Sequence, residues 1–77
     1  MFVFIQLFER ENYIELYVAS NGKIVTWEDC KNLEEVMQYV KDHNLQYARL
    51  QIDNGKNNKK DLAGELKARL LEIRKEE

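Results

Sequence analysis

Residues 13–28 read YIELYVASNGKIVTWE, and this stretch decides the fold. Asn21 and Gly22 both tolerate the positive φ angles of a two-residue type I′ turn, the turn that suits twisted antiparallel strands. The turn fixes which side chains face each other across the hairpin: Ser20 and Lys23, Ala19 and Ile24, Val18 and Val25, Tyr17 and Thr26, Leu16 and Trp27. We therefore predict a β-hairpin whose strands are residues 13–19 and 23–28.

The residues before this hairpin predict a further strand, 2–8, which the polar run 9–12 joins to it. Symmetric closure of that connection pairs Phe8 with Tyr13. The two registers then place one apolar set on the same face of the sheet: Val3, Ile5, Leu7, Ile14, Leu16, Val18, Val25 and Trp27. Because two independent turns agree on this set, we expect its face to form the core.

A helix is expected over residues 33–43, because Asn32 is a suitable N-cap and Glu35 stands at the third helical position. Asn44 can end this helix in a left-handed conformation. Its apolar stripe consists of Leu33, Val36, Met37 and Val40.

A competing N-cap lies earlier in the chain. Thr26 is followed by Asp29 at the third position, which would extend the helix backward. This alternative takes Trp27 out of its strand and removes its match with Leu16, so we place the helix start at Asn32.

The C-terminal part of the chain predicts a strand at 45–52 and a helix at about 60–75. The strand alternates Ala48, Leu50 and Ile52 on one face with Tyr47, Arg49 and Gln51 on the other. The helix has an apolar stripe of Leu62, Leu66, Leu70 and Ile73.

These elements predict a single compact α+β domain, residues 1–77, with the element order βββαβα. The sheet would be four-stranded, mixed or antiparallel. Two helices that are each apolar on one side can cover only one face of such a sheet, and the aliphatic face matches them. Both helices are therefore expected on that face.

Cysteine usage and hydropathy suggest a cytoplasmic protein. Cys30 is the one cysteine in the chain, so it can form no internal disulfide, and a reducing compartment fits best. The apolar start, residues 1–5, is broken by Gln6 and Glu9 and reads as a strand instead of a signal peptide. No apolar run is long enough to span a membrane.

The sequence offers no catalytic or metal-binding constellation, so we expect no enzyme activity, metal or cofactor. His43 stands at the end of the first helix, where a cationic ring interacts well with free carbonyl groups. Cys30 has acidic neighbours that disfavour a thiolate, and we expect it to be a small buried side chain. Ser20 is the one serine and lies at a hairpin corner, which gives no support for a serine nucleophile.

The opposite face of the predicted sheet is unusually aromatic. It would carry Phe2, Phe4, Gln6, Phe8, Tyr13, Glu15, Tyr17, Ile24, Thr26, Glu28, Tyr47, Arg49 and Gln51. A solvated sheet face is normally polar, and a contiguous apolar surface usually marks an interaction site. Aromatic residues are also good strand formers without any partner, and the C-terminal helix could instead fold over this face and bury it.

The leading functional hypothesis is a non-catalytic interaction domain that uses this aromatic face to form a homodimer or to bind a protein partner. Its contacts would be Phe2, Phe4, Phe8, Tyr13, Tyr17, Tyr47 and Arg49. A specific version is a small phage or mobile-element protein that inhibits a host protein.

The alternative hypothesis is a single-stranded nucleic-acid binder. Tyr47 and Arg49 would stack on bases, while Lys56, Lys59 and Lys60 would contact phosphate. A net charge of −2 supplies no strong positive field, and the element order is not that of an RNA-recognition motif.

Overall fold

The computed structural model describes the backbone of residues 2–76 and the side chains of residues 2–73. Its strands and helices follow one another in the order βββαβα, with a short 3₁₀ turn, η1, before the last strand. They are β1 (Phe2–Glu9), β2 (Ile14–Ser20), β3 (Lys23–Cys30), α1 (Leu33–Asp42), η1 (Leu45–Tyr47), β4 (Arg49–Asn54) and α2 (Leu62–Glu76). The predicted α+β fold is confirmed.

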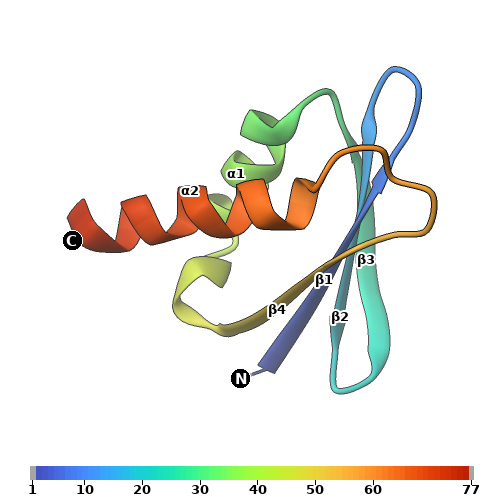
Figure 1. Cartoon of the computed structure of the whole chain (residues 1–77). Helices are drawn as coiled ribbons and strands as arrows, with labels where there is room; N and C mark the ends of the chain where they lie inside the picture. Colours follow the sequence, from blue (N-terminus) through green and yellow to red (C-terminus); the bar gives the residue numbers. More distant parts are fainter. Residues whose placement is uncertain (1, 77) are drawn as a thin grey trace.

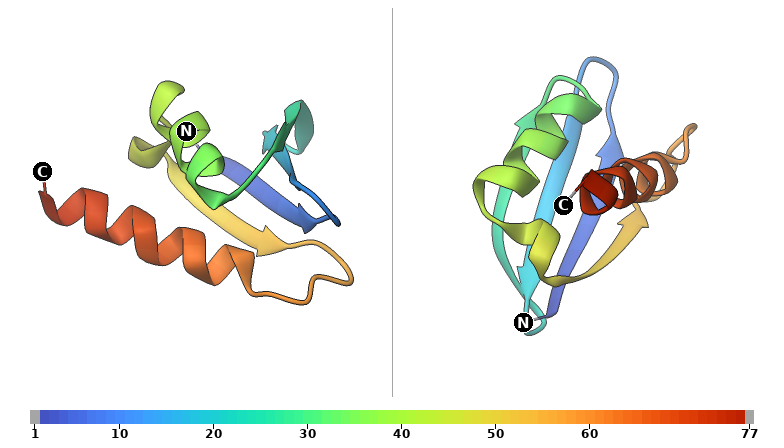
Figure 2. Two further views of the ribbon diagram at one scale, coloured as in Figure 1. Left: turned by 90° about the horizontal axis from the view of Figure 1, so that it is seen from above. Right: turned by 90° about the vertical axis from the view of Figure 1, so that its left-hand side faces the viewer.

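The four strands form one mixed sheet in the order β3-β2-β1-β4. β1 pairs antiparallel with β2 and parallel with β4, while β2 pairs antiparallel with β3. Both helices lie on the same side of the sheet (Figure 1). α1 lies over the β2 and β3 side, and α2 lies over the β1 and β4 side (Figure 2). The C-terminal helix therefore does not cover the opposite face.

The core lies between the sheet and the two helices. The sheet contributes Val3, Ile5, Leu7, Ile14, Leu16, Val18, Cys30 and Ile52, while the helices and η1 contribute Leu33, Val36, Met37, Val40, Leu45, Leu62, Ala63, Leu66 and Leu70. Six of the eight residues predicted for the core face of the first three strands are buried. Val25 and Trp27 are the exceptions.

The Asn21-Gly22 turn has the predicted left-handed geometry, with φ angles of 55° and 80°. In the first hairpin, in contrast, the partner of each β1 residue lies two positions further along β2 than predicted. Ile5 lies opposite Val18 where Leu16 was expected. The two-residue shift leaves every side chain on its predicted face, because facing alternates with a period of two.

The cause of this shift is the connection between β1 and β2. The N–H of Arg10 donates to the carbonyl oxygen of Tyr13 at 2.9 Å, which closes a turn over residues 10–13. Tyr13 therefore belongs to the connection, and its predicted pairing with Phe8 is wrong.

β3 contains a bulge that was not predicted from the sequence. Ala19 pairs with Ile24 as predicted, but the next residue, Val18, pairs with Thr26, so Val25 is the extra residue. From this point the register moves by one, and Trp27 lies opposite Tyr17. The prediction that Trp27 packs in the core is wrong, since its side chain is 66% exposed.

Asp29 and Cys30 give a physical reason for the bulge. Without it, continued pairing would put Asp29 opposite Ile14, on the core face, and would turn Cys30 outward. With it, Cys30 lies opposite Ile14 and is buried, while Asp29 lies opposite Glu15 and is exposed. A buried unpaired carboxylate is far less favourable than a buried thiol.

α1 begins as predicted and ends at Asp42, one residue before the predicted end, with His43 as its C-cap. The Asn32 side chain accepts a hydrogen bond from the Glu35 N–H, while the Glu35 carboxylate accepts one from the N–H of Lys31. Asn44 follows the helix with φ 55°. Since Thr26 lies inside β3, the alternative start of the helix at Thr26 is wrong.

β4 starts later than predicted, at Arg49, because the left-handed Asn44 leads first into the 3₁₀ turn Leu45–Tyr47. Tyr47 is therefore not part of the sheet. At the other end of β4, the Gly55 N–H donates to the Leu7 carbonyl at 2.7 Å, which extends the parallel pairing by one residue. A methyl group on Gly55 would collide with the ring of Phe8, so the chain requires glycine there for steric reasons.

Candidate functional site

The sheet face that points away from both helices is called here the outward face. The pairing places the following residues on it: Phe2, Phe4, Gln6 and Phe8 from β1, Glu15, Tyr17 and Ala19 from β2, Ile24, Trp27 and Asp29 from β3, and Arg49, Gln51 and Asp53 from β4. Paired residues of neighbouring strands point to the same side of a sheet. The bulge therefore adds Trp27 to the face that the sequence already predicted to be aromatic.

The most exposed apolar side chains of this face are Trp27, Ile24 and Phe2, at 66%, 64% and 51% exposure. Trp27 lies directly opposite Tyr17, which is half-buried. Phe4 is also half-buried and lies one row from Tyr17 on the adjacent strand. Together these five residues form an apolar surface that crosses from β1 to β3.

Phe8, at the end of β1, packs against residues of its own chain. Its ring meets the Tyr17 ring edge-on at 5.3 Å between centroids, and the Arg10 guanidinium lies 5.1 Å from its centre. Its other neighbour is Gly55, after β4. Phe8 is thus half-buried by contacts within the chain, and it marks the end of the open apolar surface.

Glu15 accepts hydrogen bonds from two side chains at the edge of this surface. Arg10 Nε donates to one carboxylate oxygen at 2.7 Å, and the Tyr17 hydroxyl donates to the other at 2.8 Å. The Arg10 bond, followed by the Tyr17 bond, lowers the pKa of Glu15, and the same bond to Glu15 raises the pKa of Tyr17. The network holds the Tyr17 ring in place on the outward face.

Sequence reasoning missed Trp27 as a site residue because it assumed a regular hairpin. Asp29 and Cys30 held a signal for the bulge. The charged Asp29 faces solvent and the apolar Cys30 faces the core only if β3 contains one extra residue before them. The predicted strand ended at residue 28, before these two residues.

The residues proposed for nucleic-acid binding fall into two separate groups. Tyr47 and Arg49 lie before and at the start of β4, whereas Lys56, Lys59 and Lys60 follow its end, so the strand's length separates them (Figure 1). The structure does not bring the aromatic and basic groups together.

The loop of lysines is tied to the end of β1. Asn58 accepts from the Glu9 N–H at 2.9 Å and donates to the Leu7 carbonyl at 2.8 Å. The Lys59 N–H donates to the Glu9 carboxylate at 2.8 Å. These bonds between main-chain groups and side chains hold the loop against β1, although its lysine side chains are exposed.

The N-terminus of α2 lies beside these lysines and could attract an anion. Its free main-chain N–H groups, however, already donate hydrogen bonds to side chains of the same chain. The N–H groups of Ala63 and Gly64 donate to Asn54 and Asp61, each at 2.9 Å. Asn54 also donates to Asp61, and this bond, with that from Gly64, lowers the pKa of the Asp61 carboxyl group. An anion would have to displace these acceptors.

No known protein family matches this sequence, and comparison with curated proteins and with solved structures finds no similar protein. The function must therefore be inferred from the geometry of this chain alone.

Cys30 and His43 line one hollow at the side of α1, together with several carboxylates. Burial, followed by the nearby charges of Glu28, Glu35 and Asp29, raises the pKa of Cys30 to about 11. A thiol with this pKa is protonated at neutral pH and is a poor nucleophile. His43 Nδ1 lies 2.9 Å from the Tyr39 carbonyl and its ring stacks on Tyr39, so it acts as a helix C-cap.

Metal-binding clusters and membrane-spanning helices are both absent from the part of the chain that the structure describes. Among the side chains of residues 2–73, no three histidine, cysteine or acidic groups gather where they could hold a metal ion. No helix in the described chain combines the length and apolar character needed to cross a membrane.

Proposed function

We propose that this chain is a non-catalytic protein-interaction domain whose outward face binds a second copy of itself. The observation that supports this most directly is the exposure of Trp27, Ile24 and Phe2 beside the half-buried rings of Phe4 and Tyr17. Aromatic residues supply most of the binding energy at the centres of protein interfaces. An exposed tryptophan that a strand bulge turns outward is difficult to explain as a contribution to folding.

The charges of the outward face favour a second copy as the partner. Arg49 stands at one end of the β4 part of this face and Asp53 stands at the other, four residues along the same strand. If two copies pack face to face about a two-fold axis that crosses the strands, strand direction is reversed between them. Arg49 then approaches the partner's Asp53, and this contact occurs twice.

The same arrangement is favourable for the apolar residues. The axis that pairs these charges crosses the row that Gln51 shares with Phe4 and Ile24. Phe4 and Ile24 therefore meet their counterparts in the partner subunit, and Trp27 lies one row away from the partner's Ile24. The helices of both copies remain outside, as in other pairs of packed sheets.

The size of the face indicates a weak complex. Four strands about 4.8 Å apart, with six residues each at about 3.3 Å, give a flat area of roughly 400 Å². Stable interfaces bury about 800 Å² per partner, so self-association is expected at micromolar or higher concentrations.

We further propose that the protein acts in the cytoplasm. This rests on Cys30, which is the one cysteine of the chain, is buried and forms no disulfide. Such a residue has no need of an oxidising compartment.

The first experiment uses Trp27 as its own reporter, since it is the only tryptophan. Sedimentation and tryptophan emission are measured from about 10 μM to 1 mM, a range chosen for the weak class of interface. We expect the sedimentation coefficient to rise and the emission to shift to the blue over the same range. Replacement of Trp27 by serine should remove the rise, while the circular dichroism stays unchanged.

The matched control is Leu71→Ser, because Leu71 is also an exposed apolar residue but lies on α2, away from the outward face. This variant should associate like the wild type. A wild type that stays monomeric throughout, with constant emission, would contradict self-association.

A charge exchange tests the arrangement within the dimer. Arg49→Glu and Asp53→Lys should each weaken association, and the double variant should restore it because the charges again pair. If the double variant is as weak as the single ones, the two-fold arrangement is wrong.

The nucleic-acid alternative predicts a different result. A single-stranded oligothymidylate would bind with an affinity that falls steeply with salt, whereas an apolar face is barely screened. Binding of that kind, weakened by Lys59→Glu but not by Trp27→Ser, would favour the alternative.

A further inference from the structure

The outer edge of β4 carries main-chain groups that no strand of the described chain pairs with. β4 is the last strand of the sheet, and β1 is its one neighbour. The bond from the Gly55 N–H to Leu7 sets the alternation of the parallel ladder. The odd-numbered residues of β4 alternate in step with Gly55, so their N–H and C=O groups point toward β1. The N–H and C=O groups of Leu50 and Ile52 therefore point away from β1.

The two edge strands of the sheet differ in how easily a further strand could pair with them. The β3 edge is protected against such pairing, whereas the β4 edge is not. β3 has the bulge at Val25, which interrupts regular pairing with any further strand. β4 pairs with β1 over six residues without a register shift. A regular, unprotected edge is the geometry that accepts an added strand.

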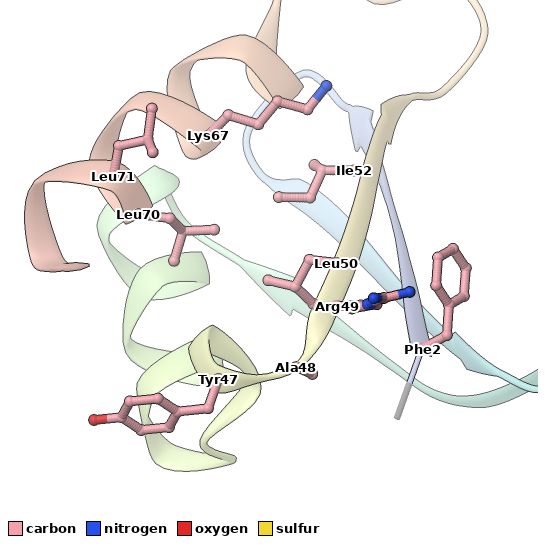
Figure 3. Close-up of a pocket in the computed structure, with 9 residues that line it drawn as sticks. All are labelled: Phe2, Tyr47, Ala48, Arg49, Leu50, Ile52, Lys67, Leu70 and Leu71. Carbon is pink, nitrogen blue, oxygen red and sulfur yellow. The ribbon is translucent and has the colours of Figure 1, made fainter.

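A groove runs beside this edge, between β4 and α2. Its volume is about 650 Å³, and Leu50 and Ile52 extend from β4 toward α2 to form its floor (Figure 3). Leu70 and Leu71 line the opposite wall. Leu71 is 57% exposed at the rim, so an apolar side chain in the groove would cover it.

The groove is cationic. Its two charged lining residues are Lys67 on α2 and Arg49 on β4, and no carboxylate is among the described residues that line it. Figure 3 shows Lys67 reaching across from α2 near Ile52, while Arg49 turns to the other side of β4 beside Phe2. A ligand that combines apolar groups with a carboxylate complements this lining.

We propose that β4 and this groove bind an extended acidic peptide segment of another protein by adding it as a fifth strand. The segment's main chain pairs with Leu50 and Ile52. Alternate apolar side chains enter the groove, as the two-residue period of a strand requires. A carboxylate of the segment pairs with Lys67. This surface meets the outward face at Phe2 and Arg49, but its peptide contacts are Leu50, Ile52 and Lys67, so neither proposal requires the other.

The test titrates ¹⁵N-labelled protein with hexapeptides in which valine, leucine or phenylalanine alternates with threonine and which end in glutamate. We expect saturable shifts of the Leu50 and Ile52 amide signals. A peptide ending in lysine amide, and a peptide N-methylated at its central residues, should each bind more weakly. The first change removes the ion pair and the second removes the strand hydrogen bonds.

Lys67→Glu should weaken binding by about threefold or more, as expected for loss and reversal of an exposed ion pair. The matched control is Lys41→Glu, the same charge change at an exposed position of α1, which should bind the peptide as the wild type does. Trp27→Ser should also leave peptide binding unchanged.

Three results would overturn the proposal. One is the absence of saturable shifts in β4 with every peptide of the set. Another is equal affinity for peptides ending in glutamate and in lysine. The third is loss of peptide binding in Trp27→Ser, which would place the peptide on the outward face.

Discussion

At the scale of single residues, Cys30 shows how one buried group links stability to pH. The thiol lies under α1 opposite Ile14, with 3% of its surface exposed. Burial and nearby acidic groups raise its pKa from 9.0 to about 11. In the unfolded chain the same thiol ionises at its ordinary value.

Cys30 should therefore make the protein less stable at high pH. A raised pKa means that the folded state holds the proton where the unfolded state loses it, so this contribution is complete below pH 9 and is lost as the pH rises toward 11. We expect the free energy of unfolding to fall across this range. In Cys30→Ala the fall should be smaller, although the variant is less stable overall.

Urea denaturation at pH 8, 9.5 and 11 measures this difference. Tyr17 and Tyr39, whose pKa values are also raised, remain in both proteins and act as a common background. Parallel curves for the wild type and Cys30→Ala would show that the thiol does not carry the effect.

At the scale of elements, the bulge in β3 decides which side chains reach the outward face. Val25 and Thr26 both oppose Val18, and both line a hollow on the helix side, where Tyr39 and Thr26 share a side-chain hydrogen bond. Because Val25 is the extra residue and is 65% exposed, the pairs on either side of it do not depend on it.

Deletion of Val25 should therefore be tolerated, which is unusual for a residue inside a strand. The regular ladder that results keeps Trp27 opposite Tyr17 and Cys30 opposite Ile14. We expect unchanged circular dichroism, an exposed Trp27 by acrylamide quenching, and a Cys30 thiol that still resists labelling.

Deletion of Val18, which belongs to the regular part of β2, is the control. It forces the residues before it onto the opposite face and should unfold the domain. If deletion of Val25 also unfolds the protein or exposes Cys30, then the bulge is required for the fold.

Local chemistry explains which elements could be predicted from the sequence. Asn21, Gly22 and Asn44 adopt positive φ angles in the structure, and these residue types signal such turns. Turn 10–13 lacks a comparable signal, because its geometry depends on the bond between Arg10 and Tyr13. The parallel pairing of β1 with β4 joins residues 47 positions apart, and no short motif encodes it.

The outward face could be predicted only in part for the same reason. Phe2, Phe4 and Tyr17 follow from simple alternation along β1 and β2. The outward position of Trp27 depends on the bulge in β3, which simple alternation does not predict. That β4 is an edge strand depends on the strand order, which is a property of the whole sheet.

At the scale of the whole molecule, one small core supports all seven elements. Leu16 in the sheet and Leu66 in α2 have no exposed surface, and they come from opposite sides of that core. Truncation of either side chain leaves a cavity that a small domain cannot easily fill.

Leu16→Ala and Leu66→Ala should each lower the free energy of unfolding by about 2–5 kcal/mol, out of a total of roughly 5–15 kcal/mol for a domain. Chemical denaturation measures both. Leu71→Ala, at an exposed position of α2, serves as the control and should change stability by less than about 0.5 kcal/mol. Losses below about 1 kcal/mol in both core variants would mean that the core tolerates cavities.

The position of β1 between β2 and β4 has a consequence for the order of folding. The two hairpins of β1, β2 and β3 join residues that are close in the sequence, so they can form early at a small loss of chain entropy. The pairing of β1 with β4 must wait until α1 has brought the chain back across 47 residues. During synthesis, β1 therefore leaves the ribosome with one edge unpaired, and it stays so until β4, which ends at Asn54, has followed.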